Sequence, residues 1–401
     1  SGSSSSAASS VASSSSSAVS SASSGSSITS SSSTSASGTK AAVVLPDTGQ
    51  TGSFTTTPGE DSDLIQNPPS YTVNGNGTVT DNVTGLMWQQ SDSGETLFAN
   101  AQAYCDGLVL GGFSDWRMPT AHELFSIQNY LNSKPSLPTE FQINTTPLTA
   151  TGVLPATYIS GTYWYSSEIS QSGVSTCDQT LTNTNTATIC SQWSTNSGGG
   201  VGNKARYGAV KLSKQEFYNV RCVRDVTTVT LPSVHFTNNG DGTITDNYTG
   251  LVWSANVDGT ARTWEDTLKY VNTLNSSGGY AGKSDWRVPN IRELFSIVDL
   301  TKFGPSLDAT FFNSTNIKNI TGIAYATKTN NPDQGTFWSS TTSMGDNNIA
   351  WDLHNIYDGI VSYSPKTAYT KTGTTTVIPA ALEYVLLVRG PVASSGASSS
   401  A

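Results

Sequence analysis

The sequence is poor in charged residues, and it has no long apolar run. Asp, Glu, Lys and Arg together make up only 12% of the 401 residues, and the net charge is −9. An acidic chain without a cluster of Lys or Arg is not expected to bind nucleic acid or anionic membranes. No apolar run reaches the roughly 18 residues that a membrane-spanning helix needs, so we expect no membrane span.

The residue types that usually carry out catalysis are also scarce. The three histidines, His122, His235 and His354, are scattered, and no Cys/His set has the spacing of a zinc site. No histidine accompanies a Gly-x-Ser-x-Gly turn, and the Gly-rich stretch at 197–203 lacks the Lys of a phosphate loop. The two halves of the chain share no paired carboxylates that could cleave a glycan, apart from positions explained below by capping or packing. These absences predict a protein that is not an enzyme and that folds without a metal or cofactor.

Serine dominates both ends of the chain. Of the first 40 residues, 24 are Ser, and the first charged residue is Lys40. Such a segment cannot bury enough apolar surface to offset the entropy lost on ordering. We therefore expect residues 1–60 to form a Ser-rich tail or spacer, and residues 393–401 to form a second tail. The hydroxyl groups make the N-terminal tail a candidate for O-glycosylation and for contact between subunits.

The remaining composition is typical of secreted bacterial surface proteins, with abundant Ser, Thr, Asn and Gly and little charge. The chain begins with neither Met nor a signal peptide, as expected of a processed, exported protein. A Ser-rich spacer often follows a lipid-modified cysteine. A lipid anchor upstream is therefore an open alternative, although no Cys stands at position 1.

The region between the tails contains two copies of one unit. YTVNGNGTVTDNVTGLMWQQ at 71–90 returns as FTNNGDGTITDNYTGLVWSA at 236–255, and YNVRCVRD faces YVLLVRG at the far end, both at an offset of 165. Similarity at such a long period indicates a repeated domain. We place the first repeat at 64–226 and the second at 233–392, joined by the short TTVTLP link.

Each repeat begins with a predicted β-hairpin. Asn-Gly and Asp-Gly stand beside alternating Thr, Val and Ile, which is typical of tight turns between antiparallel strands. Alternatively, Asn239, Asp241 and Asp246 could supply oxygen ligands to calcium. An EF-hand loop would need an acidic residue about twelve positions on. The chain has TGLVW there, so we favour the turn.

A longer helix is predicted next. Residues 263–275 place Trp264, Leu268, Val271 and Leu274 along one face, with Thr263 as the N-cap. The stretch LFANAQAYCDGL is its counterpart in the first repeat.

A second helix follows a block that is nearly identical in the two repeats. DWRMPTAHELFSI begins at 115 and DWRVPNIRELFSI at 285. In both, an N-cap residue precedes a Glu by three positions, so we assign the Glu to helix capping rather than to acid–base chemistry. The Asp and Arg could form a carboxylate–arginine site, but a packed Trp flanked by a structural ion pair is the simpler interpretation. The proposed structural motif comprises Asp115, Trp116, Arg117 and Glu123, and also Asp285, Trp286, Arg287 and Glu293.

These elements predict an α+β fold, in which two helices pack on a small, twisted, mainly antiparallel sheet with long loops. The loops at about 142–206 and 302–371 exceed ordinary connections, and binding residues often lie in such loops. We take their aromatic residues as candidate interaction residues: Tyr158, Trp193, Tyr207, Tyr325, Trp351 and Tyr357.

Five landmarks in a fixed order resemble a known family. TGLMW, an Ala- and Tyr-rich helix with Cys105, DWRMPTAHELFSI, YWYSSE and VRCVR resemble the Lcl C-terminal domain, a domain of unknown function in exported bacterial proteins, and the match covers both repeats. That family includes the C-terminal domain of a collagen-like bacterial adhesin. The resemblance implies two tandem C-type-lectin-like domains that act in adhesion or surface interaction, with extracellular glycans as ligands. The second repeat departs from the pattern where LLVRG replaces RCVRD.

Four cysteines in an exported chain suggest disulfides. Val271 aligns with Cys105 and Leu387 with Cys222, so the second repeat lacks both members of one pair together. The other two cysteines lie in one loop of the first repeat. We predict the bridges Cys105–Cys222 and Cys177–Cys190.

Three functions remain after these exclusions. The first is a structural subunit that self-associates into an extracellular fibre or surface layer. The second is a discrete lectin-like adhesin that binds glycans. The third, a secreted glycan-active enzyme, is disfavoured by the missing carboxylate pairs. We favour the structural subunit, located outside a bacterial cell or on its surface.

Overall fold

The computed structural model describes residues 43–131, 137–142, 162–169, 191–196, 201–203, 217–299, 307–312, 335–344, 346–354, 360–370, 375 and 377–390. The chain divides into two compact units, Ser1–Gly38 and Thr39–Ala401, and all described residues belong to the second unit. The first 42 residues and the predicted C-terminal tail lie outside the described residues.

Each repeat begins with a small antiparallel sheet, as the sequence predicts. The strand order is β1-β2-β3-β9 in the first repeat and β10-β11-β12-β18 in the second, so the last strand of each repeat returns beside its opening hairpin. The strands are β1 (Tyr71–Val73), β2 (Thr78–Asp81), β3 (Leu86–Gln89), β9 (Val223–Asp225), β10 (Phe236–Asn238), β11 (Thr243–Asp246), β12 (Val252–Ser254) and β18 (Val388–Arg389).

The turns of these hairpins have the predicted chemistry. Gly75 and Gly240 have φ angles of 75° and 79°, a left-handed conformation that Gly adopts readily. The Asp241 carboxylate accepts hydrogen bonds from the N–H of Thr243 at 3.0 Å and from its hydroxyl at 2.6 Å. Asp241 therefore stabilises the turn through its own side chain.

Two helices follow in each repeat. They are α1 (Phe98–Asp106), α2 (Ala121–Ser126), α3 (Trp264–Ser276) and α4 (Ile291–Ser296). In α3, Trp264, Leu268 and Val271 are buried on the predicted face, and Thr263 caps the helix by accepting from the Asp266 N–H. The short helices α2 and α4 both begin with the predicted capping box.

The largest sheet joins the two repeats, which the sequence did not predict. Its eight strands run in the order β13-β14-β15-β7-β6-β5-β8-β4, and all neighbours are antiparallel except β5 and β8. Val361 of β15 pairs with Val201 of β7 across the repeats. The strands are β4 (Glu95–Leu97), β5 (Thr162–Ile169), β6 (Ser191–Asn196), β7 (Val201–Asn203), β8 (Phe217–Asn219), β13 (Thr336–Thr342), β14 (Ile349–His354) and β15 (Ile360–Pro365). The regions 142–206 and 302–371 therefore both contribute strands to this sheet.

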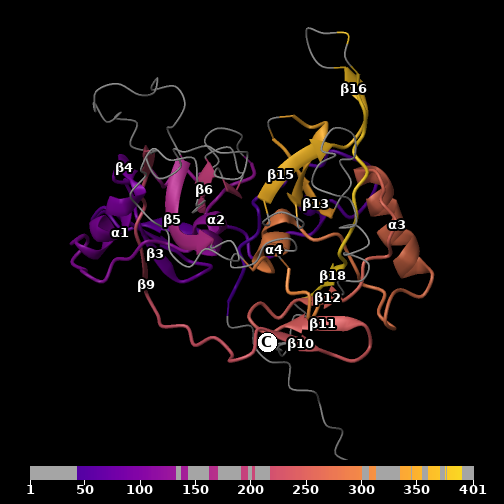
Figure 1. The fold of residues 1–401 in the computed structure, drawn as a ribbon, viewed down its shortest axis with the longest axis horizontal. Helices are drawn as coiled ribbons and strands as arrows, with labels where there is room; N and C mark the ends of the chain where they lie inside the picture. Colours follow the sequence, from indigo (N-terminus) through magenta and orange to yellow (C-terminus); the bar gives the residue numbers. More distant parts are fainter. Residues whose placement is uncertain are drawn as a thin grey trace, which may run out of the picture. The chain divides into compact units, whose positions relative to one another are not determined.

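The short helices lie against this sheet. α2 contacts β5 and β6, and α4 contacts β13 and β14 (Figure 1). The remaining elements are a 3-10 turn, η1 (Asp61–Asp63), and a small ribbon of β16 (Tyr369–Thr370) with β17 (Val377–Ile378).

The predicted disulfide between Cys105 and Cys222 is present. It joins α1 to the residue before β9, inside a buried cluster that includes Trp116. In the second repeat, Val271 and Leu387 belong to the corresponding buried cluster, so apolar packing takes the place of the bridge. The other predicted pair, Cys177 and Cys190, lies outside the described residues.

Residues 43–67, here called the N-terminal segment, pack against the second repeat, so the prediction that the spacer extends to residue 60 is wrong. Gln50 is fully buried. Its side-chain amide donates to the Thr342 carbonyl at 2.7 Å and accepts from the Thr342 N–H at 2.9 Å. The hydroxyls of Thr55 and Thr57 also bond to Glu265. The segment is ordered by hydrogen bonds to distant residues, which its composition does not reveal.

Candidate functional site

The two copies of the repeated block pack against each other through their short helices. Phe125 of α2 and Phe295 of α4 hold equivalent positions, and each is 1% exposed. Their ring centroids lie 4.6 Å apart at an interplanar angle of 55°. The block is therefore part of the contact between the repeats as well as part of each repeat.

Around this pair, equivalent residues of the two blocks each contact the other block. Arg292 donates a hydrogen bond to the carbonyl of Gln128. The residue equivalent to Arg292 is His122, and it interacts with the backbone of Val298, which is equivalent to Gln128. Such an exchange of equivalent partners is the mark of a two-fold arrangement. The two blocks are thus related by an approximate two-fold axis near the phenylalanine pair.

His122 is buried at this contact. Its ring lies 4.9 Å from that of Phe295. Burial lowers the pKa of His122, although backbone groups of Phe295 and Val298 favour the protonated form. We therefore expect a neutral imidazole at neutral pH, which fits a packing role better than a role in binding anions.

A groove with a volume of about 900 Å³ opens beside α2 and α4, and we call it the inter-repeat groove. Its walls come from the first residues of the N-terminal segment, the two short helices, and the linker at 226–235 that connects the repeats. Most of its large side chains are apolar: Val43, Val44, Leu45, Pro46, Leu86, Val229, Leu231, Val234, Phe236, Ile297, Val298 and Phe311. Such a groove suits an apolar or extended ligand better than a small charged one.

One end of the groove carries a stack of aromatic rings. His235 lies between Phe236 and Tyr248, with ring centroids 3.8 and 3.9 Å away and nearly parallel planes. Its Nε2 lies 3.2 Å from a carboxylate oxygen of Asp246. The two neighbouring rings hold the imidazole on both faces. His235 therefore forms part of the fixed groove wall rather than acting as a mobile base.

Two of the carboxylates beside the groove, Glu123 and Asp225, are paired with Arg117. Arg117 bonds to Glu123 at 2.6 and 2.8 Å and to Asp225 at 3.1 Å. Burial alone would raise the pKa of Glu123, but the Arg117 guanidinium holds it below its usual value. Glu123 is therefore held in its ionised form by Arg117, which makes it a poor general acid at neutral pH.

The Asp-Trp-Arg motif is structural, but its ion pairs differ from the expected one. Asp115 binds Arg224 through two bonds, at 2.7 and 3.0 Å, rather than Arg117. This pairing lowers the pKa of Asp115. Asp285 binds Arg389 in the same way at 2.7 and 2.9 Å. The motif therefore ties the segment before the short helix to the last strand of each repeat.

The tryptophans of the motif are packed. Trp116 and Trp286 are 3% and 2% exposed. The Trp286 indole N–H donates to the Tyr280 carbonyl at 2.9 Å. In the second repeat, Arg287 pairs with Glu293 as Arg117 does with Glu123. Neither motif presents a free reactive group.

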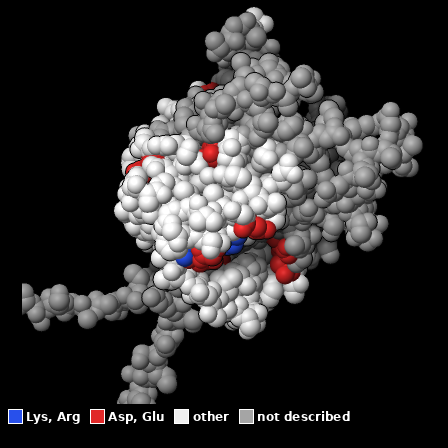
Figure 2. Space-filling view, turned by 90° about the vertical axis from the view of Figure 1, so that its left-hand side faces the viewer, with Lys and Arg blue, Asp and Glu red and all other residues white. Residues whose placement is uncertain are grey.

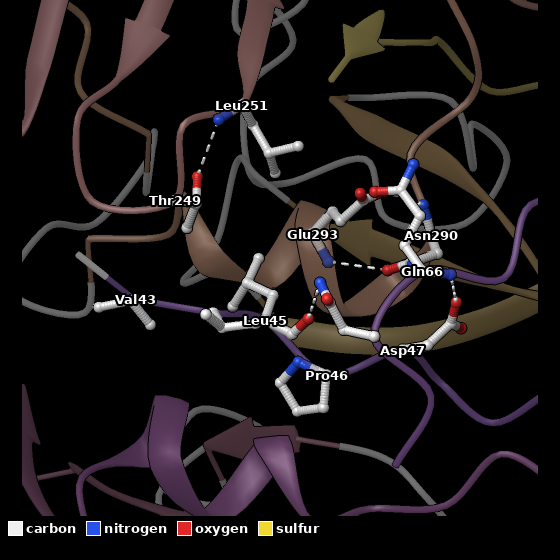
Figure 3. A pocket seen from close by; sticks show the side chains of 11 residues that line it. Val43, Leu45, Pro46, Asp47, Gln66, Thr249, Leu251, Asn290 and Glu293 are labelled. Carbon is white, nitrogen blue, oxygen red and sulfur yellow. Dashed lines mark hydrogen bonds between the residues drawn. The ribbon is translucent and has the colours of Figure 1, made fainter. Parts of the chain in front are cut away.

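A smaller pocket of about 150 Å³ lies between the N-terminal segment and the start of α4 (Figure 3). Asp47 accepts from the Gln66 N–H at 2.6 Å, and Asn290 accepts from the Glu293 N–H at 2.9 Å. These bonds hold the segment and the helix cap separately, so the pocket is lined by groups that already have partners.

Asp61 of η1 is the most perturbed carboxyl of this region. Its Oδ2 accepts from the hydroxyls of Thr48 at 2.7 Å and Thr341 at 2.6 Å, and it is 3% exposed. Burial, with a further contribution from the carboxylate of Asp47, raises the pKa of Asp61 to about 7. The group can change charge near neutral pH, and it lies where the N-terminal segment meets β13.

The described residues contain no group of three or more His, Cys, Asp or Glu side chains placed to hold a metal. Among the helices of the described residues, none is long and apolar enough to cross a membrane.

Figure 2 shows one face of the molecule, on which most described side chains are uncharged and charges of both signs gather in one band.

The family model of the Lcl C-terminal domain matches residues 77–224 and 242–376, which is more than half of the chain. The chain belongs to the Lcl C-terminal domain family. The two matched ranges correspond to the two repeats, so the predicted family resemblance is confirmed. No curated protein and no solved structure matches the chain.

Within these tandem Lcl C-terminal domains, two of the predicted interaction residues, Trp193 and Trp351, lie in the described part of the chain. Trp351 in β14 is only 6% exposed and packs edge-to-face on Tyr130 at 5.4 Å. Its place in the core corrects the expectation that it is a surface recognition residue. Trp193 lies in β6, where its backbone pairs with Asn203. The others lie outside the described residues: Tyr158, Tyr207, Tyr325 and Tyr357.

Sequence reasoning missed the inter-repeat groove. One signal was present, because the linker contains Val226, Val229, Leu231 and Val234, which is unusually apolar for an exposed connection. In the structure these side chains are 45 to 55% exposed. The groove itself depends on how the two Lcl C-terminal domains pack, which no local pattern encodes.

Proposed function

We propose that this protein is a non-catalytic extracellular bacterial surface protein, which assembles with further copies into a fibre or surface layer. The main support is the inter-repeat groove, which has a volume of about 900 Å³ and mostly apolar walls, and is flanked by exposed linker side chains. Monomeric soluble proteins rarely expose large contiguous apolar patches, and those that do usually bind something there.

Several further observations support this proposal. The Cys105–Cys222 disulfide suits a protein exported to an oxidising compartment. Glu123 and Asp225 beside the groove are both paired with Arg117, so they are more suited to a structural role than to catalysis. The Ser-rich residues 1–42 precede the groove wall at Val43 directly and offer a connection to other copies.

A second candidate is a lectin-like adhesin that binds glycans. Each repeat has two helices, a small antiparallel sheet and a last strand that returns beside the first hairpin, which supports a relation to C-type-lectin-like folds. The groove also combines the rings of His235 and Tyr248 with the hydroxyls of Thr84, Thr120 and Thr249. Aromatic rings beside hydroxyl groups can bind sugars.

Electron microscopy of the native material, together with light scattering of the purified full chain, tests the proposal. Regular fibres or layers and concentration-dependent assembly are expected. A chain that stays monomeric at high concentration, and forms neither structure in native material, would contradict self-assembly. A glycan panel probed with the same monomer then tests the adhesin alternative.

A further inference from the structure

The linker between the repeats offers backbone groups that nothing in the described structure uses. Among the hydrogen bonds of the described residues, none involves the backbone of Thr227–Leu231. All five of these residues are exposed. Figure 1 shows the connection from β9 to β10 running as a strap without helix or strand. Free N–H and C=O groups in an extended segment are a template on which another strand can pair.

The part of the groove wall formed by the N-terminal segment has a similar feature. Val44 is 39% exposed, and within the described part of the chain its backbone takes part in no hydrogen bond. Its neighbours are fixed, because the Val43 N–H donates to the Tyr248 carbonyl at 2.8 Å and the Leu45 carbonyl accepts from Asn67 at 3.2 Å. A fixed segment with free backbone groups is prepared for pairing at little entropic cost.

Two apolar side chains of the linker line the groove. Val229 and Leu231 are two residues apart and 45 and 46% exposed, so in an extended segment they lie on one face. A ligand could form hydrogen bonds with the free backbone groups and place small apolar side chains against this face. An extended peptide has this chemistry, and it binds by adding a strand.

From these observations we propose that the inter-repeat groove binds, as an added strand, the Ser-rich tail at residues 1–42 of a second copy of this chain. This inference rests on the proposed self-assembly and names the surface through which it occurs.

The composition of residues 1–42 suits this groove. The first 39 residues carry no charged side chain, so burying them requires no desolvation of a charged side chain. Val11, Val19 and Ile28 are its largest apolar side chains, and all three are β-branched, which favours the extended conformation. Because pairing through the backbone depends little on side chains, a Ser-rich sequence can use it.

The length and position of residues 1–42 also favour a second copy as the partner. It joins the described structure at Val43, which is itself a residue of the groove wall. Fully extended, 42 residues span up to about 140 Å, which is long enough to extend to a neighbouring copy. A segment that leaves one groove and enters the next would link copies head to tail, and such contacts generate filaments when the rotation does not close.

The first test compares assembly of three full-length proteins by light scattering and electron microscopy. The groove variant carries Val229→Asp and Leu231→Asp, and the control carries Val377→Asp at a position 62% exposed on β17, outside the groove lining. We expect the groove variant to need at least about tenfold more protein for assembly, because charge is placed in the contact. The control should stay within about twofold of the wild type. Equal assembly of all three would overturn the inference while leaving the proposed function intact.

The second test does not depend on assembly. A labelled synthetic peptide of residues 1–42 is titrated with the full chain, and the matched control peptide carries Asp in place of Val11, Val19 and Ile28. We expect the first peptide to bind the wild type and to bind the groove variant at least about tenfold more weakly. No binding, or equal binding of both peptides, would overturn the inference. Two other results would also overturn it. One is a glycan that binds in the groove and is not displaced by the peptide. The other is a set of cross-links showing that residues 1–42 of the same copy fill the groove.

If the Asp variant fails to fold, as judged by circular dichroism, Val229→Thr with Leu231→Thr replaces it, since Thr makes both positions polar without adding a charge. A wild type that never assembles but binds the peptide would contradict the proposed function and leave the groove assignment standing. The two failures are therefore distinguishable.

Discussion

Phe125 and Phe295 occupy the same position in two copies of one sequence block, and their rings contact each other at 4.6 Å. A duplicated domain that pairs through equivalent residues resembles a two-fold dimer whose subunits have been joined into one chain. This relationship explains why the block is repeated so closely. It must serve both as the scaffold of each repeat and as the contact between them.

Replacing either phenylalanine should therefore destabilise the whole described unit. We expect Phe125→Ala and Phe295→Ala each to lower the free energy of unfolding by about 3 to 5 kcal/mol. The double variant should lose less than the sum, because the residues are in contact. Urea denaturation measures all three, with the surface variant Leu382→Ala, at 43% exposure, as a control. Strict additivity would show that the rings act independently.

The Cys105–Cys222 bridge should stabilise the first repeat alone. It closes a loop of 117 residues, for which chain entropy predicts a contribution of about 4 to 5 kcal/mol. Reduction should therefore increase hydrogen exchange in α1 and β9 and leave α3 unaffected. Peptide mapping without reduction checks this bridge and also tests the predicted Cys177–Cys190 bridge. Recovery of a Cys105–Cys177 peptide would refute both pairings.

Asp61 predicts a specific dependence of stability on pH. Its pKa is raised to about 7, whereas the unfolded chain has an Asp pKa of about 3.9. Between these values the folded state holds a proton that the unfolded state has lost, so stability falls as pH rises through this window. The loss attributable to Asp61 is about 4 kcal/mol at most.

Asp61→Asn places an uncharged amide where the wild type has the protonated carboxyl. It should remove most of the stability that the wild type loses between about pH 5 and pH 7.5. Equilibrium unfolding at both pH values measures this difference. Asp115→Asn is the matched control, because its partner Arg224 lowers the pKa of Asp115 and keeps the group ionised across this window. An unchanged pH slope in Asp61→Asn would mean that water or rearrangement relieves the buried charge.

Trp351 should behave as a core residue. We expect Trp351→Ala to lower the free energy of unfolding by about 3 to 5 kcal/mol, as Trp286→Ala should, because both side chains are buried. Tyr363→Ala, at a position 58% exposed next to Trp351, should cost far less. Thermal unfolding compares the three. A Trp351→Ala protein of unchanged stability that fails to bind a ligand would restore the recognition role.

Arg292 should hold the N-terminal segment in place. Its guanidinium donates to the carbonyls of Pro46 at 3.1 Å and Asp47 at 2.6 Å, and it is 3% exposed. In Arg292→Ala those buried carbonyls lose their donor, at a cost of about 3 kcal/mol or more. Hydrogen exchange should then rise in residues 43–50. Lys269→Ala, whose side chain is 57% exposed, is the control and should leave this exchange unchanged.

Much of each repeat could be predicted from the sequence, because the determining interactions are local or duplicated. Thr120 and Glu123 lie three residues apart, so their capping box is visible in the sequence. Asp241 bonds to Thr243 two residues on, so the turn is visible too. The joint loss of two cysteines in the second copy identified the Cys105–Cys222 pair although the two residues are far apart in the chain.

Only the tertiary structure decided how the repeats combine. Asp115 pairs with Arg224 rather than with its near neighbour Arg117, because the last strand returns beside the motif. Trp351 is buried because β14 becomes an inner strand of a sheet shared by both repeats. The N-terminal segment and the inter-repeat groove likewise depend on contacts between residues hundreds of positions apart. Composition and periodicity describe each segment's own preferences, but the partner against which a surface packs depends on the shape of the rest of the folded chain.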